Sequence, residues 1–147
     1  LKTTDNPSGV DKSVFDDNQQ AITKDRYVYL TDFTNNFFNA DENVGKSVSE
    51  EVLRAHWDVA AAASPIATYA CIPTWLTDFR PDVAKLNVPI LVIHGDADRI
   101  LPYDSTAKLL PDRIADCKLV TIAGGSHGIL WTHADVINKE LLKFLAR

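Results

Sequence analysis

Residues 88–102 read VPILVIHGDADRILP, and residues 124–128 read GGSHG. The apolar run at 90–93 stops at a Gly-Asp loop, and a second run at 118–122 stops at a glycine-rich loop that carries a histidine. Two such strands joined by a helical spacer, expected at residues 104–114, form a βαβ unit. The run at 90–93 does not alternate with polar residues, which is typical of a strand buried on both faces.

Asp98 and His127 are the candidate catalytic pair. They follow the two predicted strands and lie 29 residues apart in the sequence. The carboxyl ends of parallel strands are where open α/β sheets place their chemistry. A carboxylate such as Asp98 can fix the tautomer of an imidazole, and a histidine titrates near working pH. The alternatives are that Asp96 and Asp98 only form a turn and that His127 only caps a loop.

The same loop contains a second pattern, because Gly124 to Gly128 satisfies G-x-S-x-G, the nucleophile-elbow motif. An elbow at Ser126 needs an acid and a histidine further along the chain. Only His133 and Asp135 follow, and they are too close to fold back as partners. We therefore expect Ser126 not to be the nucleophile. His94, beside a buried strand, is expected to be a hydrogen-bonded structural residue.

Composition restricts the class of protein and its partners. The 147 residues are 46% hydrophobic and carry a net charge of −5, which argues against nucleic-acid and anionic-membrane partners. Scattered histidines and cysteines predict no metal site. Cys71 and Cys117 lack a redox or metal spacing, and neither a membrane-length apolar run nor a signal-peptide core is present, so we expect a cytoplasmic protein.

Residues 10–80 are expected to be helical and to contain no strand. Apolar residues recur at helical spacing from 10 to 38, which predicts two helices broken near Lys24, followed by a polar turn at 41–45. Ser47 and Glu50 suggest a capping box before the next helix. Ser64 and Pro65 then match the first positions of a further helix, which Pro73 ends.

The chain therefore divides into a helical segment, 1–80, and an α/β segment, 81–147. Residues 78–82 are expected to be a short link between them. A terminal helix is predicted over residues 133–146. Its expected buried stripe is Val136, Ile137, Leu141, Leu142, Phe144 and Leu145.

Two features suggest that the sequence is part of a larger fold. Two parallel strands cannot make a stable sheet, so further strands must come from a longer polypeptide or from another chain. The sequence also contains no methionine. We expect a fragment or a processed chain; the alternative is that the leading residues were trimmed.

Residues 88–102, 125–128 and 131–135 together resemble the last third of an α/β-hydrolase. More narrowly, they resemble the group of cofactor-free haloperoxidases, aryl esterases and γ-lactamases. Residues 29–43 and 69–79 resemble the helical cap of that group. The resemblance implies the C-terminal part of an α/β-hydrolase fold: a helical cap, the last two parallel strands and their flanking helices.

The resemblance also implies a function. Asp98 and His127 would be the acid and the base of a Ser-His-Asp triad that hydrolyses carboxylic esters, amides or lactams without a cofactor, with perhydrolase or haloperoxidase activity as a side reaction. The nucleophile and the oxyanion hole would lie in the N-terminal half of the fold, so this chain alone is expected to be inactive. The family further suggests a homo-oligomer.

Aromatic residues of the helical segment are candidates for an acyl pocket, although each could equally be plain core: Phe33, Phe37, Trp57 and Trp75. Two other functions stay open. The chain could be a non-catalytic half-fold that oligomerises, or part of a dehalogenase or epoxide hydrolase whose nucleophile is an aspartate in the other half. The sequence decides neither the substrate nor its enantiopreference.

Overall fold

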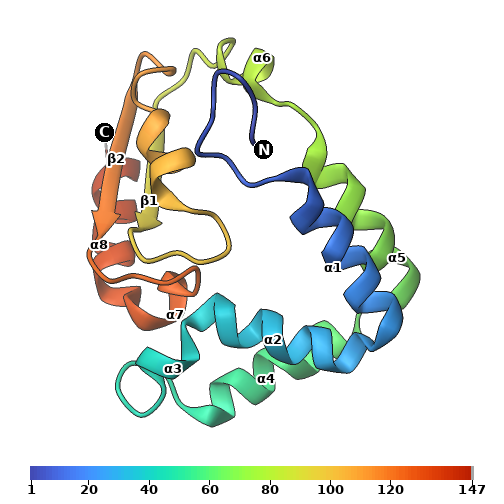
Figure 1. The fold of residues 1–147 in the computed structure, drawn as a ribbon. Coiled ribbons are helices and arrows are strands. Elements are labelled where there is room, and N and C mark those ends of the chain that lie inside the picture. Colours follow the sequence, from blue (N-terminus) through green and yellow to red (C-terminus); the bar gives the residue numbers. More distant parts are fainter. Residues whose placement is uncertain (147) are drawn as a thin grey trace. The chain divides into compact units, whose positions relative to one another are not determined.

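The chain divides into two compact units, Leu1–Asp78 and Phe79–Arg147. The computed structural model describes residues 1–146. The first unit is helical and the second contains the two strands (Figure 1). The elements of the first unit are α1 (Lys12–Lys24), α2 (Arg26–Phe38), α3 (Ala40–Asn43), α4 (Glu50–Ala62), α5 (Pro65–Cys71) and the 3-10 helix η1 (Ile72–Leu76). Those of the second are α6 (Arg80–Val83), β1 (Ile90–Gly95), the 3-10 turns η2 (Tyr103–Ser105) and η3 (Ala107–Leu109), β2 (Cys117–Ile122), α7 (Ile129–Thr132) and α8 (Ala134–Leu145).

Aspartates set the boundaries of the first two helices. Asp11 caps α1 by accepting a hydrogen bond from the amide two residues later, at 3.0 Å. Asp25 has an extended backbone, so it ends α1, and its carboxylate accepts the amides of Tyr27 and Val28 at 3.1 Å to start α2. The predicted break near Lys24 is confirmed.

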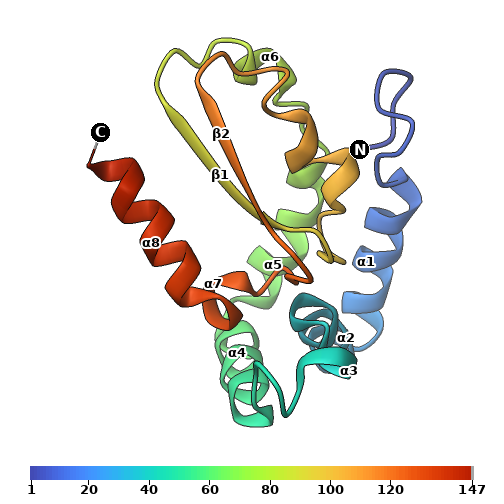
Figure 2. The same cartoon turned by 90° about the vertical axis from the view of Figure 1, so that its left-hand side faces the viewer.

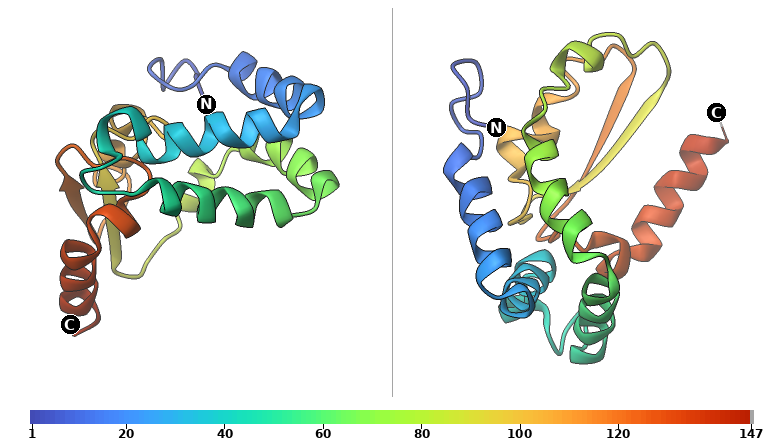
Figure 3. Two further views of the ribbon diagram at one scale, coloured as in Figure 1. Left: turned by 90° about the horizontal axis from the view of Figure 1, so that it is seen from below. Right: turned by 90° about the vertical axis from the view of Figure 1, so that its right-hand side faces the viewer.

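The long helices of the first unit pack in pairs. Figure 3 shows α2 and α4 side by side, and α1 contacts α2 and α5. The Arg26 guanidinium, at the start of α2, donates to the carbonyls of Ala60, Ala61 and Ala63 at 2.9 to 3.0 Å. These carbonyls lie at the C-terminal end of α4, where Ala60 also accepts the Ala63 amide at 3.3 Å, so Arg26 joins the two helices.

Two local predictions in this unit are wrong. The expected polar turn at 41–45 begins as a short helix, α3, because Asn39 adopts a left-handed conformation (φ 48°) that closes α2 and lets the chain turn into a new helix. The cap of α4 is Ser49, whose hydroxyl accepts the Val52 amide at 3.3 Å, whereas Ser47 donates to Asn43. The Ser64 cap of α5 is confirmed.

The second unit is built on a parallel strand pair. β1 and β2 run in register from Ile90 opposite Cys117 to Gly95 opposite Ile122, which confirms both predicted strands. α8 lies along one face of the pair (Figure 2). Its Ile137 forms a buried cluster with Ile122 and Ile129, against which side chains of both strands pack.

The spacer between the strands is not the predicted helix over 104–114. It contains two 3-10 turns instead, because Thr106 (φ −132°, ψ −98°) interrupts the helical backbone and Pro111 supplies no amide hydrogen. The predicted link at 78–82 is likewise partly helical, since α6 starts at Arg80. The βαβ unit therefore keeps its parallel strands while its crossover is irregular.

The predicted terminal helix over residues 133–146 is confirmed as α8, and the short helix α7 precedes it. The prediction of its buried face is wrong. Of the predicted buried stripe only Ile137 is buried, whereas Leu142 and Leu145 are 69% and 76% exposed. The helix is amphipathic, but the described residues 1–146 leave the outer part of its apolar stripe exposed.

Within residues 1–146 no one helix has the length and apolar character needed to cross a membrane. One bent pair, Glu50–Ala62 with Pro65–Leu76, meets the length and composition test when both halves are taken together, with a bend of 96° between them.

Candidate active site

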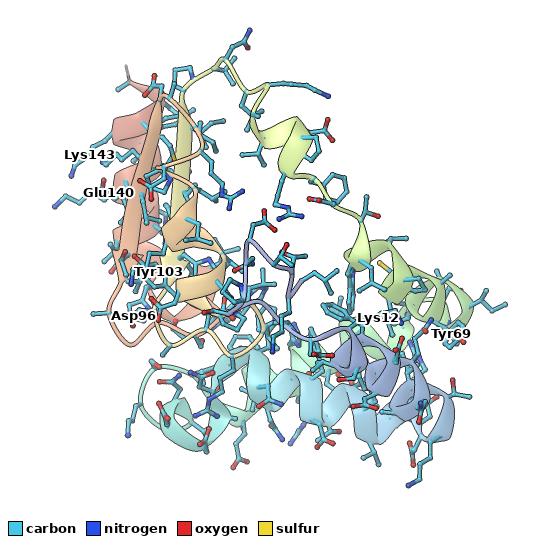
Figure 4. The ribbon with its side chains drawn as sticks, turned by 45° about the horizontal axis from the view of Figure 1, so that its top comes forward. Lys12, Tyr69, Asp96, Tyr103, Glu140 and Lys143 are labelled. Atoms are coloured by element: carbon cyan, nitrogen blue, oxygen red, sulfur yellow. The ribbon has the colours of Figure 1, made fainter. Side chains whose placement is uncertain are left out.

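The loops that follow β1 and β2 are hydrogen-bonded to each other. The Asp96 amide donates to the Ile122 carbonyl and the Ala97 amide to the Gly125 carbonyl, both at 3.1 Å. The Asp96 carboxylate accepts the Gly124 amide at 2.7 Å. Figure 4 shows Asp96 at this end of the strand pair. Backbone and side chain together therefore bring the acid loop to the histidine loop.

Two glycines make this close approach possible. A Cβ atom added to Gly95 would overlap the carbonyl group of Gly125. In the other direction, a Cβ on Gly125 would lie 3.0 Å from the Gly95 Cα and 2.8 Å from a methyl carbon of Ile129. No other residue type fits at Gly95 without moving backbone, so its glycine serves close packing of the loops.

Asp98 is buried and fully engaged in hydrogen bonds. Its Oδ1 atom accepts the amides of Ile100 and Leu101, each at 2.8 Å, and its Oδ2 atom lies 2.7 Å from His127 Nδ1. Burial alone would raise the pKa of this carboxyl group. The hydrogen bonds from His127, Leu101 and Ile100 and the nearby imidazole outweigh that effect and lower the pKa, so Asp98 is ionised at neutral pH.

The tautomer of His127 follows from this contact. An ionised carboxylate only accepts hydrogen bonds, so Nδ1 of His127 must carry the proton. In the neutral ring Nε2 is then the basic nitrogen. The His127 side chain is 29% exposed, so the ring is not sealed inside the second unit. The predicted pair is thus brought together in the geometry that an acid and a general base require.

Ser126 and His133 do not join this pair. Ser126 is 1% exposed, and its hydroxyl accepts the Gly128 amide at 3.2 Å within its own loop. His133 Nδ1 contacts the Thr132 hydroxyl at 2.8 Å. A nucleophile has to reach a substrate carbonyl, and a buried hydroxyl in a local turn does not.

His94 makes contacts that the sequence did not indicate. Its Nε2 atom lies 2.9 Å from the Leu101 carbonyl oxygen, as expected for a hydrogen-bonded structural histidine, but also 3.2 Å from Asp98 Oδ2. The acid therefore faces two imidazoles. The sequence feature that could have predicted the contact of His94 with Asp98 is their i, i+4 spacing around a tight Gly-Asp turn.

The four aromatic candidates lie in the first unit. Phe33 and Phe37 are neighbours along α2, with ring centroids 6.1 Å apart. Trp57 on α4 packs on Tyr27, with centroids 5.7 Å apart. Trp75 in η1 is 46% exposed. Trp57 thus has a packing role within its own unit, whereas Trp75 has a large exposed surface.

Across residues 1–146, no group of three or more histidine, cysteine or acidic side chains is placed to hold a metal ion. Both cysteines are free thiols. The Asp98 and His127 pair has the geometry for proton transfer.

Comparison with known proteins finds relatives that match almost the whole chain. No protein-family model matches the chain. The putative non-heme chloroperoxidase of Synechocystis sp. is 54% identical over 145 residues, covering 99% of this chain and 52% of that protein. The bifunctional esterase/perhydrolase DCH of Acinetobacter calcoaceticus is 34% identical over 146 residues, 99% of this chain and 53% of that protein. The crystal structure of bromoperoxidase from Bacillus anthracis superposes with a TM-score of 0.91 at 39% identity, over 99% of this chain and 53% of that one.

The homologues of the chain belong to the α/β-hydrolase superfamily, and the helices and parallel strand pair of the structure are consistent with part of that fold, as the sequence predicted. Within that superfamily its homologues are non-heme chloroperoxidases, haloperoxidases and esterases. The chain spans about half the length of the curated relatives it matches.

Proposed function

We propose that this chain supplies the acid, Asp98, and the general base, His127, of a serine-dependent α/β-hydrolase that cleaves carboxylic esters. The observation that carries the proposal is the 2.7 Å contact between His127 Nδ1 and the buried, amide-anchored carboxylate of Asp98. The relative from Acinetobacter calcoaceticus, a bifunctional esterase/perhydrolase, supports the choice of ester chemistry. The nucleophilic serine comes from the other half of the fold.

The chemistry follows from the tautomer. His127 Nε2 takes the proton of the serine hydroxyl as its oxygen attacks the substrate carbonyl, and then gives it to the leaving alcohol. The imidazolium formed in between is stabilised by the Asp98 carboxylate. Water, activated in the same way, hydrolyses the acyl-enzyme and returns the serine. Amides and lactams would react by the same steps with an amine as leaving group.

Perhydrolysis is proposed as a side activity. Hydrogen peroxide replaces water as the nucleophile that attacks the acyl-enzyme carbonyl, so that serine leaves and a peracid is released. The peracid then oxidises halide in solution and is itself reduced to the carboxylic acid. His127 has the same task in both reactions, because either nucleophile must lose one proton.

Several finer features belong to the proposal. The helical segment 1–80 would act as a cap for the α/β segment 81–147, with Phe33, Phe37, Trp57 and Trp75 as candidates for an acyl pocket. The half-exposed Trp75 is better placed to meet a ligand than Trp57, which is packed on Tyr27. The partners would be a small-molecule ester or amide, the other half of the fold and further copies of the same protein, in the cytoplasm.

Two alternatives make different predictions. A non-catalytic half-fold would give no turnover even when the missing half is supplied. A dehalogenase or epoxide hydrolase would use an aspartate nucleophile, so it would be inert to a fluorophosphonate. The relatives' names favour the serine esterase over both.

The test joins this chain to the part of the Synechocystis relative that it does not match, giving a chimera of full length. We expect hydrolysis of p-nitrophenyl acetate by the chimera and none by the 147-residue chain alone. The His127→Ala chimera is the matched control, because it differs in one imidazole. Turnover that is equal with and without His127 would contradict the proposal.

A further inference from the structure

We propose that His94 is a positioning residue that holds the Asp98 carboxylate in the orientation His127 requires. The inference rests on the proposed function and adds a residue to it. Its basis is the double contact of His94 Nε2, at 2.9 Å from the Leu101 carbonyl oxygen and 3.2 Å from Asp98 Oδ2. His94 is thus the second imidazole on the oxygen that binds His127.

The two hydrogen bonds of Leu101 and the close contact of His94 with Asp98 form a ring of polar contacts. Asp98 Oδ1 accepts the Leu101 amide, the Leu101 carbonyl accepts from His94 Nε2, and the same nitrogen faces Asp98 Oδ2. Both acceptors lack a proton, so Nε2 must be the protonated nitrogen of His94. The ring fixes both the turn after β1 and the plane of the carboxylate.

The surroundings keep His94 in place. Its side chain is 13% exposed, and its ring lies beside Tyr103, with centroids 6.0 Å apart. The Tyr103 hydroxyl is bonded to Thr121 at 2.8 Å, and Thr121 is the residue opposite His94 in the strand register. Tyr103 is labelled in Figure 4 near the end of the strand pair, close to Asp96. His94 therefore cannot turn away without breaking packing on β2.

A misplaced Asp98 has a specific consequence. The Nδ1-protonated tautomer of His127 is favoured because the Asp98 carboxylate accepts that proton. If the carboxylate rotates, the Nε2-protonated tautomer gains population, and that form cannot accept the proton of a nucleophile. Loss of the His94 contact should therefore change the tautomer of His127.

Two substitutions separate the donor from the bulk of the ring. His94→Leu fills similar space without a donor, and His94→Gln places an amide N–H near the position of Nε2. His133→Leu is the matched control, because the His133 ring contacts the hydroxyl of the adjacent Thr132 and is not part of the Asp98 and His127 pair.

The readout is nitrogen-15 NMR of the histidine rings of the full-length chimera without substrate, together with the steady-state kinetics of the same protein. We expect His94→Leu to lower the fraction of His127 in the Nδ1-protonated tautomer and to reduce kcat about tenfold with little change in KM. His94→Gln restores both, and His133→Leu changes neither. Amide spectra report in each case that the second unit keeps its fold.

Each outcome decides the inference. An unchanged His127 tautomer in His94→Leu overturns it, as does a loss in His94→Gln as large as in His94→Leu. The His127 tautomer is measured without substrate, so this result does not depend on whether the chimera hydrolyses esters. A tautomer that depends on His94 in an inactive chimera would keep the positioning role and remove the esterase.

Discussion

Each unit holds a partly buried histidine with a polar neighbour, but the two environments differ. In the helical unit, His56 Nδ1 contacts the Thr34 hydroxyl at 3.2 Å, and its ring packs on Phe37, with centroids 4.6 Å apart. Burial lowers the pKa of His56, so it stays neutral. In the strand unit, His127 faces a carboxylate instead. The neighbours, rather than the residue type, decide which histidine can exchange protons.

The polar contacts of the two units differ in the same way. Most of those in the helical unit are local, such as the caps made by Asp11, Asp25 and Ser64. In the strand unit, Asp96 and Asp98 bond residues 28 and 29 positions away. Local contacts stabilise single helices, whereas distant ones assemble a site. The predictions below test this contrast.

The largest effect is expected at the acid and base. His127→Ala and Asp98→Asn in the chimera should each lower kcat by about 10³- to 10⁴-fold, because one removes the base and the other its correct tautomer. His56→Ala in the helical unit should leave kcat within about tenfold. Ester hydrolysis measured by stopped or continuous assay checks the ranking. Equal losses of kcat in His56→Ala and His127→Ala would contradict the expected difference between the two units.

Glycine substitutions come next. Gly95→Ala should destabilise the strand unit by about 3 kcal/mol, because its Cβ meets the Gly125 backbone, which cannot move without breaking the loop contacts. Gly45→Ala, in the helical unit, has open space around its Cβ and costs only about 1 kcal/mol for its positive φ of 78°. Urea unfolding followed by circular dichroism gives both values. A smaller loss at Gly95 would mean that the loops separate easily.

Arg26 tests the helical unit in turn. Arg26→Ala removes three hydrogen bonds to the end of α4 and should lower the free energy of unfolding by about 1 to 2 kcal/mol. It should not affect the tautomer of His127. Lys24→Ala, an exposed cation two residues earlier, is the control and should change stability little. A change in the His127 tautomer on losing Arg26 would show that the helical unit also sets the site.

The smallest effect concerns pH. Hydrogen bonds from Lys118 and Lys143, at 2.6 Å each, lower the pKa of Glu140 to about 2 from a usual 4.5, and the bond from Lys118 ties α8 to β2. The depressed pKa means that this stabilisation is complete above pH 4.5 and is lost as pH falls toward 2. Melting temperatures of the native chain should thus drop more over that range than those of Glu140→Gln. Parallel curves would refute this assignment.

Sequence reasoning found the parts that depend on local chemistry. Ser64 and Pro65 act on their own helix end, so their roles could be predicted from neighbouring residues. The ends of both strands could also be predicted, because each apolar run stops at a glycine-containing loop. Asp98 and His127 followed, since parallel strands end at one edge.

The missed features depend on geometry that spacing does not encode. The spacer 104–114 has helical composition, but Thr106 leaves the helical region and breaks it. The Asp96 contact to Gly124 and the His94 contact to Asp98 need the loops already folded. The predicted burial of the outer residues of α8 was wrong for another reason. A hydrophobic pattern shows which residues are apolar, but it does not show which other residues pack against them.

The most direct test of the account is fluorophosphonate labelling of the chimera, with the modified residue located by mass spectrometry. We predict one label on a serine outside the 147 residues, at a rate that falls by orders of magnitude in the Asp98→Asn chimera. Labelling of Ser126, or labelling at an unchanged rate without the Asp98 carboxylate, would contradict the claim that Asp98 and His127 activate a serine from the other half of the fold.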